Sequence, residues 1–564
     1  MKKLFITLSM LLAATIMMAG NRPLAEMQAI AAKKLNALAA ERGQRNAPAK
    51  STELRCLADK EAYTVFSSEA TNGFVIVAKS TKVDPIIGYS TESFDTDRIP
   101  ANMQWYLSEV NRNLQAIEAG EIEAPKRAAT YTRVKNFVKT KWNQEAPYNA
   151  LTPNNYPTGC VATALAQCLN YCQYPSSVDF DGYYYIVNGN NYESFNEHVS
   201  STYTWPYENS YKGKTPDDNI AELMRDCGYA TYMIYASDGS ASALKYAGIA
   251  LTHVFGYPQD CVKYYERDCW GKDDDWKQII YDELALSCPI LYAAHPGDED
   301  SEGGHAFVFS GVDADGKVYV NWGWGGSQNG YFSIDVLILG KDIYTKGHRM
   351  VTGIRTTPLA TDHAEPRIWA NAGRYTFEWS KERGNKGKTY NSLHINIPGG
   401  LANNTPCDFE GVFGIFAQDL TDGTTWIIAE DLQDPDTIPS GYGAYVDESE
   451  PFYYYYDVTG DNGLKPGHTY RMSFGTKDNR EGTWHSLICE GGEIGYDVTY
   501  TGDPKTSTVS ESPTSVPVLT DITGINDIIA QQHTDKNWYD LHGRRLATPQ
   551  KGINIMNGKK IFVK

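Results

Sequence analysis

The chain of 564 residues is too long for one hydrophobic core, because domains usually contain about 100 to 200 residues. Its formal net charge of −18 argues against a nucleic-acid partner, since phosphate binding requires a basic surface. Ten cysteines in a chain of this length are too sparse to indicate a disulfide scaffold. We therefore expect a soluble protein of several domains in which disulfide bridges are optional.

The first 127 residues predict a leader followed by a small domain. Two lysines and a short apolar run in residues 1–20 are typical of a secretory signal peptide, and the run is short for a membrane anchor. Residues 21–48 have helical spacing of alanine, leucine and lysine, and three β-rich runs follow: AYTVFSS, GFVIVAKS and DPIIGYS. We expect a small α+β domain over 21–127. The charged stretch EAGEIEAPKRAATYTR is typical of an exposed linker, either an ordinary tether or a processing site at Lys126-Arg127.

Residues 128–358 alternate helical and strand signals, and one cysteine occupies a special place among them. A loop rich in Asn and Pro precedes Cys160, and the residues after it, Val161 to Cys172, predict a buried helix. At a helix N-terminus the free N–H groups and the helix dipole favour a thiolate. Cys160 is therefore a candidate nucleophile, with an inert core thiol as the alternative, and Gln144 is the glutamine a short distance upstream.

A predicted hairpin brings a histidine and an asparagine to the same end of two strands. In HAFVFSGVDADGKVYVNWGWGG, His305 begins the first strand, Asp-Ala-Asp-Gly forms the turn, and Asn321 closes the second strand. We expect the imidazole and the amide to approach as cross-strand neighbours, so that the amide oxygen can fix the ring tautomer. The alternative for His305 is a surface residue or a satisfied core residue.

No cofactor or metal site is expected. Cys168 and Cys172 face the same way on the predicted helix, but no second pair of ligands accompanies them at zinc spacing. The acidic loop PGDEDSEGG does not match the register of a calcium loop, and we interpret it as solvated.

The C-terminal third predicts strands. Alternating runs in residues 359–500 favour a β-sandwich of unknown role, residues 501–520 have the Ser/Thr/Pro-rich composition of a linker, and residues 521–564 predict a small β unit.

Several blocks in order resemble the streptopain family of secreted bacterial cysteine proteases. The blocks are WNQEAPYN, TGCVATALAQ, SCPILYA, GGHAFV, and NWGWGG followed by GYF. The resemblance implies a papain-like α+β catalytic domain over 128–358. It also implies that Cys160 is the nucleophile, His305 the general base, Asn321 the residue that orients the imidazole, and Gln144 the oxyanion-hole side chain. Trp322 would shield the contact between His305 and Asn321 from water.

The two ends of the chain also resemble known modules. Residues 21–127 are similar to the family's inhibitory propeptide, and 521–564 to the sorting domain of the type nine secretion machinery, through WYDLHGRRL, KGINI and GKKIFVK. We therefore predict a protein that is secreted or held at the outer-membrane surface of a Gram-negative bacterium.

The predicted function is that of a secreted zymogen of a cysteine endopeptidase that acts on protein or peptide substrates. Two alternatives stay open: a non-catalytic adhesin or peptide-binding protein on the same fold, and a transglutaminase-like acyl transferase. The oligomeric state is not predicted.

Overall fold

The computed structural model describes most of the chain. The described residues are 21–43, 53–69, 73–125, 131–189, 191–210, 218–269, 273–294, 304–337, 347–370, 373–383, 389–430, 436–444, 452–457, 464–480, 482–512, 516, 519–520, 538–539, 545–546, 552–556 and 559–563. The predicted signal peptide, the Lys126-Arg127 site and most of the acidic loop lie outside these residues. Among the described residues, no helix has the length and apolar character needed to cross a membrane.

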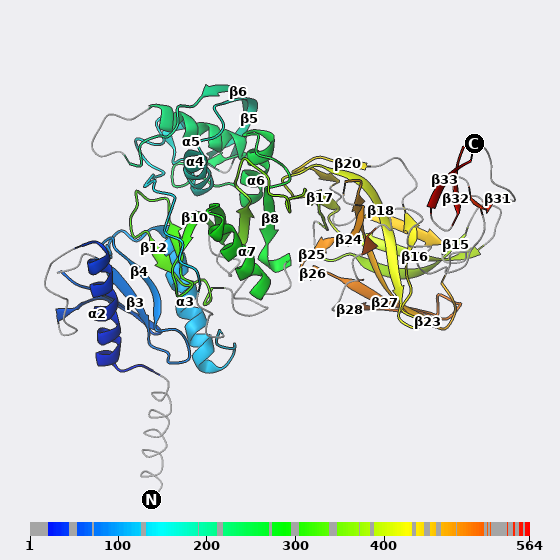
Figure 1. Cartoon of the computed structure of the whole chain (residues 1–564), viewed down its shortest axis with the longest axis horizontal. Helices are drawn as coiled ribbons and strands as arrows, with labels where there is room; N and C mark the ends of the chain where they lie inside the picture. Colours follow the sequence, from blue (N-terminus) through cyan, green and yellow to red (C-terminus); the bar gives the residue numbers. More distant parts are fainter. Residues whose placement is uncertain are drawn as a thin grey trace, which may run out of the picture. The chain divides into compact units, whose positions relative to one another are not determined.

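Two compact units make up the molecule (Figure 1). The first contains residues 1–364 with 405–407, and the second contains 365–404 with 408–564. The predicted propeptide and the predicted catalytic domain therefore share one unit.

The first unit contains six described helices and thirteen described strands. The helices are α2 (Leu24–Glu41), α3 (Ala101–Ala119), α4 (Cys160–Cys172), α5 (Asp218–Ala230), α6 (Leu244–His253) and α7 (Asp273–Ala285), with short 3-10 turns at Pro153–Asn155 and Arg267–Cys269. The strands are β1 (Arg55–Asp59), β2 (Tyr63–Ser67), β3 (Phe74–Ala78), β4 (Ile86–Ser90), β5 (Ser177–Asn188), β6 (Asn191–Thr202), β7 (Ile234–Tyr235), β8 (Lys263–Glu266), β9 (Ile290–Ala294), β10 (His305–Val312), β11 (Val318–Asn321), β12 (Gly330–Phe332) and β13 (Arg349–Thr352).

One antiparallel sheet of ten strands runs through this unit. Its order is β1-β2-β3-β4-β12-β11-β10-β9-β13-β8. The strands of the predicted propeptide join those of the predicted catalytic domain where β4 pairs with β12, with Tyr89 opposite Tyr331 and Gly88 opposite Phe332. The hairpin β5–β6 lies apart from this sheet and pairs with β7.

Helices cover both faces of the sheet. On one face, α2 packs on Phe66, Val75 and Val77 of the propeptide strands. On the opposite face, α3 and α7 bury their apolar sides against a cluster that includes Phe307 and Trp322. Helices α4, α5 and α6 form a third cluster, which takes Val308 from β10. Residues 307 and 308 point to opposite faces, because side chains alternate along a strand.

Helix α3 is positioned by its apolar stripe. Met103, Tyr106, Val110, Leu114 and Ile117 recur at three- and four-residue spacing and are all buried. The helix ends at residue 120, a glycine in the left-handed conformation (φ 78°) whose N–H reaches the carbonyl oxygens at 116 and 117. This stripe fixes which face of the sheet α3 covers.

Several sequence predictions are confirmed. The three β-rich runs of the first domain form β2, β3 and β4, and the helix predicted in residues 21–48 is α2. The buried helix predicted after Cys160 is α4. Helix α3 and the long β5–β6 hairpin were not predicted from the sequence.

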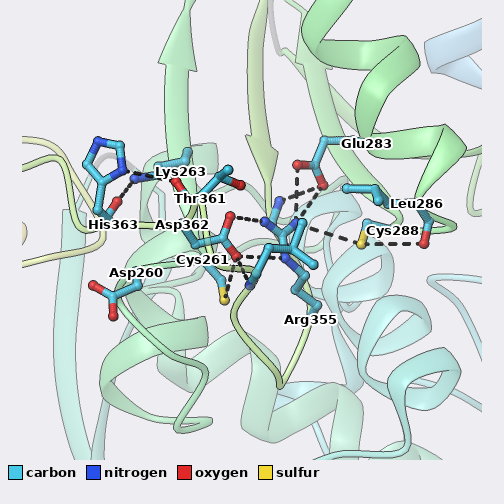
Figure 2. A network of polar contacts seen from close by, with 12 residues as sticks. Asp260, Cys261, Lys263, Glu283, Leu286, Cys288, Arg355, Thr361, Asp362 and His363 are labelled. Carbon is cyan, nitrogen blue, oxygen red and sulfur yellow. Dashed lines mark hydrogen bonds and ion pairs between the residues drawn. The ribbon is translucent and has the colours of Figure 1, made fainter.

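The last segment of the first unit is fastened to α7 by Arg355 (Figure 2). Its guanidinium binds the Glu283 carboxylate at 3.3 Å and the Asp362 carboxylate at 3.1 Å. The Cys261 and Cys288 sulfurs lie at the edges of this network, at 3.5 Å from Asp362 Oδ2 and 3.8 Å from Arg355 Nη1. Both thiols are free. Arg355 therefore connects the last residues of the first unit, through Asp362, to helix α7, through Glu283.

The second unit consists of strands within its described residues. They are β14 (Ile368–Ala370), β15 (Thr376–Arg383), β16 (Thr389–Ile397), β17 (Leu401–Asn403), β18 (Phe409–Asp419), β19 (Thr425–Glu430), β20 (Asp436–Ile438), β21 (Gly443–Ala444), β22 (Phe452–Asp457), β23 (His468–Asp478), β24 (Thr483–Ser486), β25 (Ile488–Cys489), β26 (Gly492–Glu493), β27 (Gly495–Tyr500), β28 (Thr508–Ser512), β29 (Leu519–Thr520), β30 (Trp538–Tyr539), β31 (Arg545–Leu546), β32 (Gly552–Met556) and β33 (Lys559–Val563).

One core in this unit takes side chains from three sheets. Phe377 comes from the sheet of β15, β16 and β22, Phe413 and Phe474 come from the sheet of β18 and β23, and Ile368 and Leu401 come from the sheet of β14 and β17. Strands β30 to β33 form a separate four-stranded sheet. The β-sandwich over 359–500 stays a prediction.

Candidate active site

Cys160 is the first residue of α4. The residue before it, Gly159, has φ 84°, and a Cβ there would meet the Met233 sulfur at 2.6 Å. Only glycine fits this conformation and this space, so the entry to α4 is fixed by the sequence. The Cys160 sulfur accepts a hydrogen bond from the backbone N–H of Ala306 at 3.2 Å. The predicted nucleophile therefore touches the residue that follows His305.

The charge state of this thiol differs from the sequence expectation. Burial raises the pKa of Cys160 above its ordinary value, and the N–H groups of Ala306, Val161 and Cys160 itself act in the opposite direction. We expected the helix end to favour the thiolate, but desolvation outweighs these hydrogen bonds in this structure. The net effect in this structure is to favour the thiol form of Cys160 over the thiolate.

His305 begins β10, where it lies opposite Ala294 of β9. The register of β10 and β11 pairs Asn321 with Val308. The expectation that His305 and Asn321 approach as cross-strand neighbours is therefore wrong for this register. Because side chains alternate along β10, the His305 side chain leaves on the face of Phe307 and the Asn321 side chain on the face of Val308.

The Asn321 side chain is fully buried and faces α4. Its Nδ2 donates to the Thr140 carbonyl oxygen and to Gln167 Oε1, both at 2.8 Å. Its Oδ1 accepts from the N–H of Gly323 at 3.1 Å. The structure thus brings Asn321 to the helix that carries Cys160.

Trp322 packs on the opposite face of the sheet. Its ring lies between Phe307, Phe332 and Tyr106, with ring centroids 5.1, 5.2 and 5.9 Å away. Its carbonyl oxygen accepts from Asn102 Nδ2 at 2.6 Å. Tyr106 and Asn102 belong to α3, so the predicted propeptide holds Trp322 by both its ring and its backbone.

Gln144 lies beside the nucleophile loop. Its carbonyl oxygen accepts from the N–H of Thr158 at 2.9 Å, and its own N–H donates to Asn143 Oδ1. The residue is 6% exposed. The main chain at Gln144 is therefore bound to Thr158, which lies two residues before Cys160.

Two residues at this site were not singled out from the sequence. Gln167 and Thr140 contact Asn321, and both are buried. The signal for Gln167 was a glutamine on the apolar side of a buried helix, two turns after Cys160. Thr140 carried no such signal, because a loop threonine is common.

The predicted catalytic domain and the predicted propeptide, which together form the first unit, each match a known protein family. Residues 142–332 match the model of the peptidase C10 family, and residues 22–114 match that of the Spi protease inhibitor. Streptopain of Streptococcus pyogenes is 32% identical over 300 residues, which cover 48% of this chain and 73% of streptopain. The chain belongs to the peptidase C10 family. The resemblance to the streptopain family is thereby confirmed, and so is the inhibitor domain at its N-terminal side.

Other C10 relatives differ in how much they share. The thiol protease/hemagglutinin PrtT of Porphyromonas gingivalis is 30% identical over 305 residues, but the match spans only 34% of that protein's length. A fragment of Prevotella intermedia prointerpain A gives a TM-score of 0.48 at 28% identity, covering 54% of this chain and 99% of the fragment. The structure of active interpain A from Prevotella intermedia gives a TM-score of 0.35 at 32% identity, covering 41% of this chain and 98% of that structure.

Proposed function

We propose that this protein is the secreted zymogen of a cysteine endopeptidase that hydrolyses peptide bonds in proteins. The observation that carries the proposal is the position of Cys160: a thiol at the mouth of α4, 3.2 Å from the N–H of the residue after His305. The candidate nucleophile and the backbone beside the candidate base come from distant parts of the chain and lie in contact within the family's matched segment, residues 142–332.

In this proposal the Cys160 thiolate attacks the substrate carbonyl carbon while His305 carries the proton as imidazolium. The tetrahedral oxyanion is bound by the Gln144 side chain and the N–H of Cys160; one donor of this kind is worth roughly 3 to 4 kcal/mol of barrier. His305 then protonates the leaving amine, and water hydrolyses the thioester. Asn321 orients the imidazole of the mature enzyme, and Trp322 shields their contact.

Three features account for latency in the zymogen. Burial raises the pKa of the Cys160 thiol and so disfavours the thiolate. His305 and Asn321 leave the sheet on opposite faces. Helix α3 covers the face of Trp322 and binds its carbonyl oxygen through Asn102. Removal of residues 21–127 would free this face, so that His305 can move to Asn321.

The first test is the replacement Cys160→Ala. We expect loss of hydrolysis of a denatured protein substrate, with an unchanged thermal unfolding transition. The matched control is Cys172→Ala in the same helix. Its thiol donates to the Ile354 carbonyl oxygen at 3.5 Å, and its removal should leave hydrolysis intact. Undiminished hydrolysis in the Cys160→Ala protein would overturn the proposal.

We propose further that residues 521–564 direct export by the type nine secretion machinery. The support is the sequence resemblance of this tail. Deletion of 521–564 should leave the protein inside the outer membrane of the producing cell, whereas the full chain appears on the cell surface or in the medium. Unchanged export of the truncated chain would contradict this part of the proposal.

A further inference from the structure

A buried hydrogen-bond network connects the nucleophile helix to Asn321. Gln167 Oε1 accepts from the Thr140 hydroxyl at 2.9 Å and from Asn321 Nδ2 at 2.8 Å. Gln167 and Asn321 are fully buried, and Thr140 is 3% exposed. Gln167 lies seven residues after Cys160 on α4, and seven residues make two helical turns, so both side chains leave the same side of the helix.

The partners fix the direction of both amide groups. The Thr140 carbonyl oxygen can only accept, so the Asn321 atom that faces it must be Nδ2. The N–H of Gly323 can only donate, so the other atom must be Oδ1. The Gln167 atom that faces Asn321 Nδ2 is therefore the acceptor Oε1, and both hydrogens of the Asn321 amide are used.

This arrangement leaves Gln167 with an unpaired donor. Its Nε2 is buried and has no acceptor among the residues that the structure describes. A buried donor without a partner costs stability, and a leucine of similar size would avoid that cost. The stability of the fold therefore does not explain the Gln167 side-chain amide. We conclude that a glutamine is present at this position because its Oε1 accepts hydrogen bonds.

The oriented Asn321 amide can accept one more hydrogen bond. Its Oδ1 accepts from the N–H of Gly323 and keeps a second lone pair. An imidazolium N–H needs an acceptor of this kind. If the amide lost its anchor on Gln167, the side chain could rotate away from α4 or present Nδ2, a donor, to the imidazolium.

We propose that Gln167 is a positioning residue of the peptidase site. By accepting from Asn321 Nδ2, it ties Asn321 to the helix of Cys160 and keeps Oδ1 available to the His305 imidazolium in the mature enzyme. This inference rests on the proposed function. Gln167 touches neither the substrate nor the reacting sulfur, and it acts through Asn321.

The test compares Gln167→Leu with Gln167→Glu in the mature enzyme. The first variant removes the acceptor, and the second, protonated in its buried site, keeps a carbonyl oxygen at the same place. Values of kcat/KM are measured across pH and divided by the concentration of Cys160 that reacts with iodoacetamide, so that misfolded protein does not count. If Gln167→Leu does not fold, Gln167→Met takes its place, because its unbranched chain matches glutamine in shape.

For the apolar variant we expect kcat/KM to fall about 10- to 100-fold, the scale of one hydrogen bond to a charged group. The alkaline limb of the profile should also move to lower pH, since an imidazolium without its acceptor loses its proton more readily. Gln167→Glu should restore most of the activity and the position of the limb.

Two outcomes would overturn the inference: a wild-type profile in the apolar variant, or an equal loss in both variants with the alkaline limb unmoved. Failure of the proposed function gives a different result, because the unaltered chain would then show no hydrolysis that depends on Cys160.

Discussion

In this zymogen the backbone of β10 already contacts the candidate nucleophile, but the side chains of His305 and Asn321 are not yet on the same face of the sheet. The Cys160 sulfur already meets the backbone of β10 at Ala306. Because Asn321 pairs with Val308 and side chains alternate along β10, however, His305 and Asn321 leave the sheet on opposite faces. Since His305 is the first residue of β10, a change confined to the start of this strand would suffice to move its ring. We infer that activation requires a local rearrangement and no refolding of the catalytic domain.

The lowered pKa of a second histidine, His348, indicates how the stability of the zymogen depends on pH. His348 is buried, shares a hydrogen bond of 2.8 Å with the Tyr292 hydroxyl, and lies beside the rings of Trp105 and Tyr292. Burial and the charges of Arg267 and Arg349 lower the pKa of His348 to about 3. The unfolded chain takes up a proton near pH 6.5, so the folded state binds fewer protons between these values and loses stability as the pH falls below 6.5.

Unfolding by denaturant at pH 7 and pH 5 tests this prediction. The free energy of unfolding of the first unit should drop by about 2 kcal/mol between pH 6.5 and pH 5 through His348 alone. The variant His348→Gln keeps a hydrogen-bond partner for Tyr292 but cannot be protonated, so its loss of stability over this range should be smaller by that amount. Equal losses in both proteins would show that His348 is not the group responsible.

At the scale of elements, α3 is the part of the propeptide that reaches the catalytic strands. Asn102 binds the Trp322 carbonyl oxygen, and the Tyr106 hydroxyl donates to the Ser333 carbonyl oxygen at 3.1 Å. Loss of a buried hydrogen bond of this kind costs about 1 to 3 kcal/mol. We therefore expect Asn102→Ala to weaken inhibition by the propeptide, with an inhibition constant about 10-fold higher when the separate propeptide is added to the mature enzyme.

The control for this prediction is Gln104→Ala. Gln104 lies on the exposed side of α3 and donates only to the Ile99 carbonyl oxygen within the propeptide. The inhibition constant of this variant should match that of the unaltered propeptide. An Asn102→Ala propeptide that inhibits as well as the control would contradict the role given to α3.

Local patterns were sufficient to predict many of these elements. The glycine before Cys160 and the small apolar residues after it indicate the start and the burial of α4. In α7, Trp276, Ile280 and Leu284 recur at helical spacing, and these three side chains are buried. In each case the signal lies within a few turns of chain, where spacing alone decides which side chains share a face.

Long-range pairing was not predictable in the same way. An irregularity in the pairing of β10 with β11, between Phe309 and Val312, sets the register that places Val308 opposite Asn321. The pairing of β4 with β12 joins segments more than two hundred residues apart, and no local pattern specifies it. For the same reason the contact of Gln167 with Asn321 appeared only in the folded chain.

At the scale of the whole molecule, propeptide and catalytic domain share one sheet. Cleavage and loss of residues 21–127 would remove β4 from β12, which would then become the edge of a six-stranded sheet running from β12 to β8. Strand β12 contains only three residues, Gly330–Phe332, and a short edge strand offers few backbone groups for unwanted pairing. The order of the strands therefore allows the propeptide to leave without exposing a long edge.

We propose above all that Cys160 is the nucleophile of a peptidase released from this zymogen. The most direct measurement is titration of the processed enzyme with iodoacetamide, with residual hydrolysis plotted against equivalents added and the alkylated residue identified by mass spectrometry. Hydrolysis should fall linearly to zero at one equivalent, with the label on Cys160. Retained hydrolysis with Cys160 fully alkylated, or inactivation with the label on another cysteine, would contradict it.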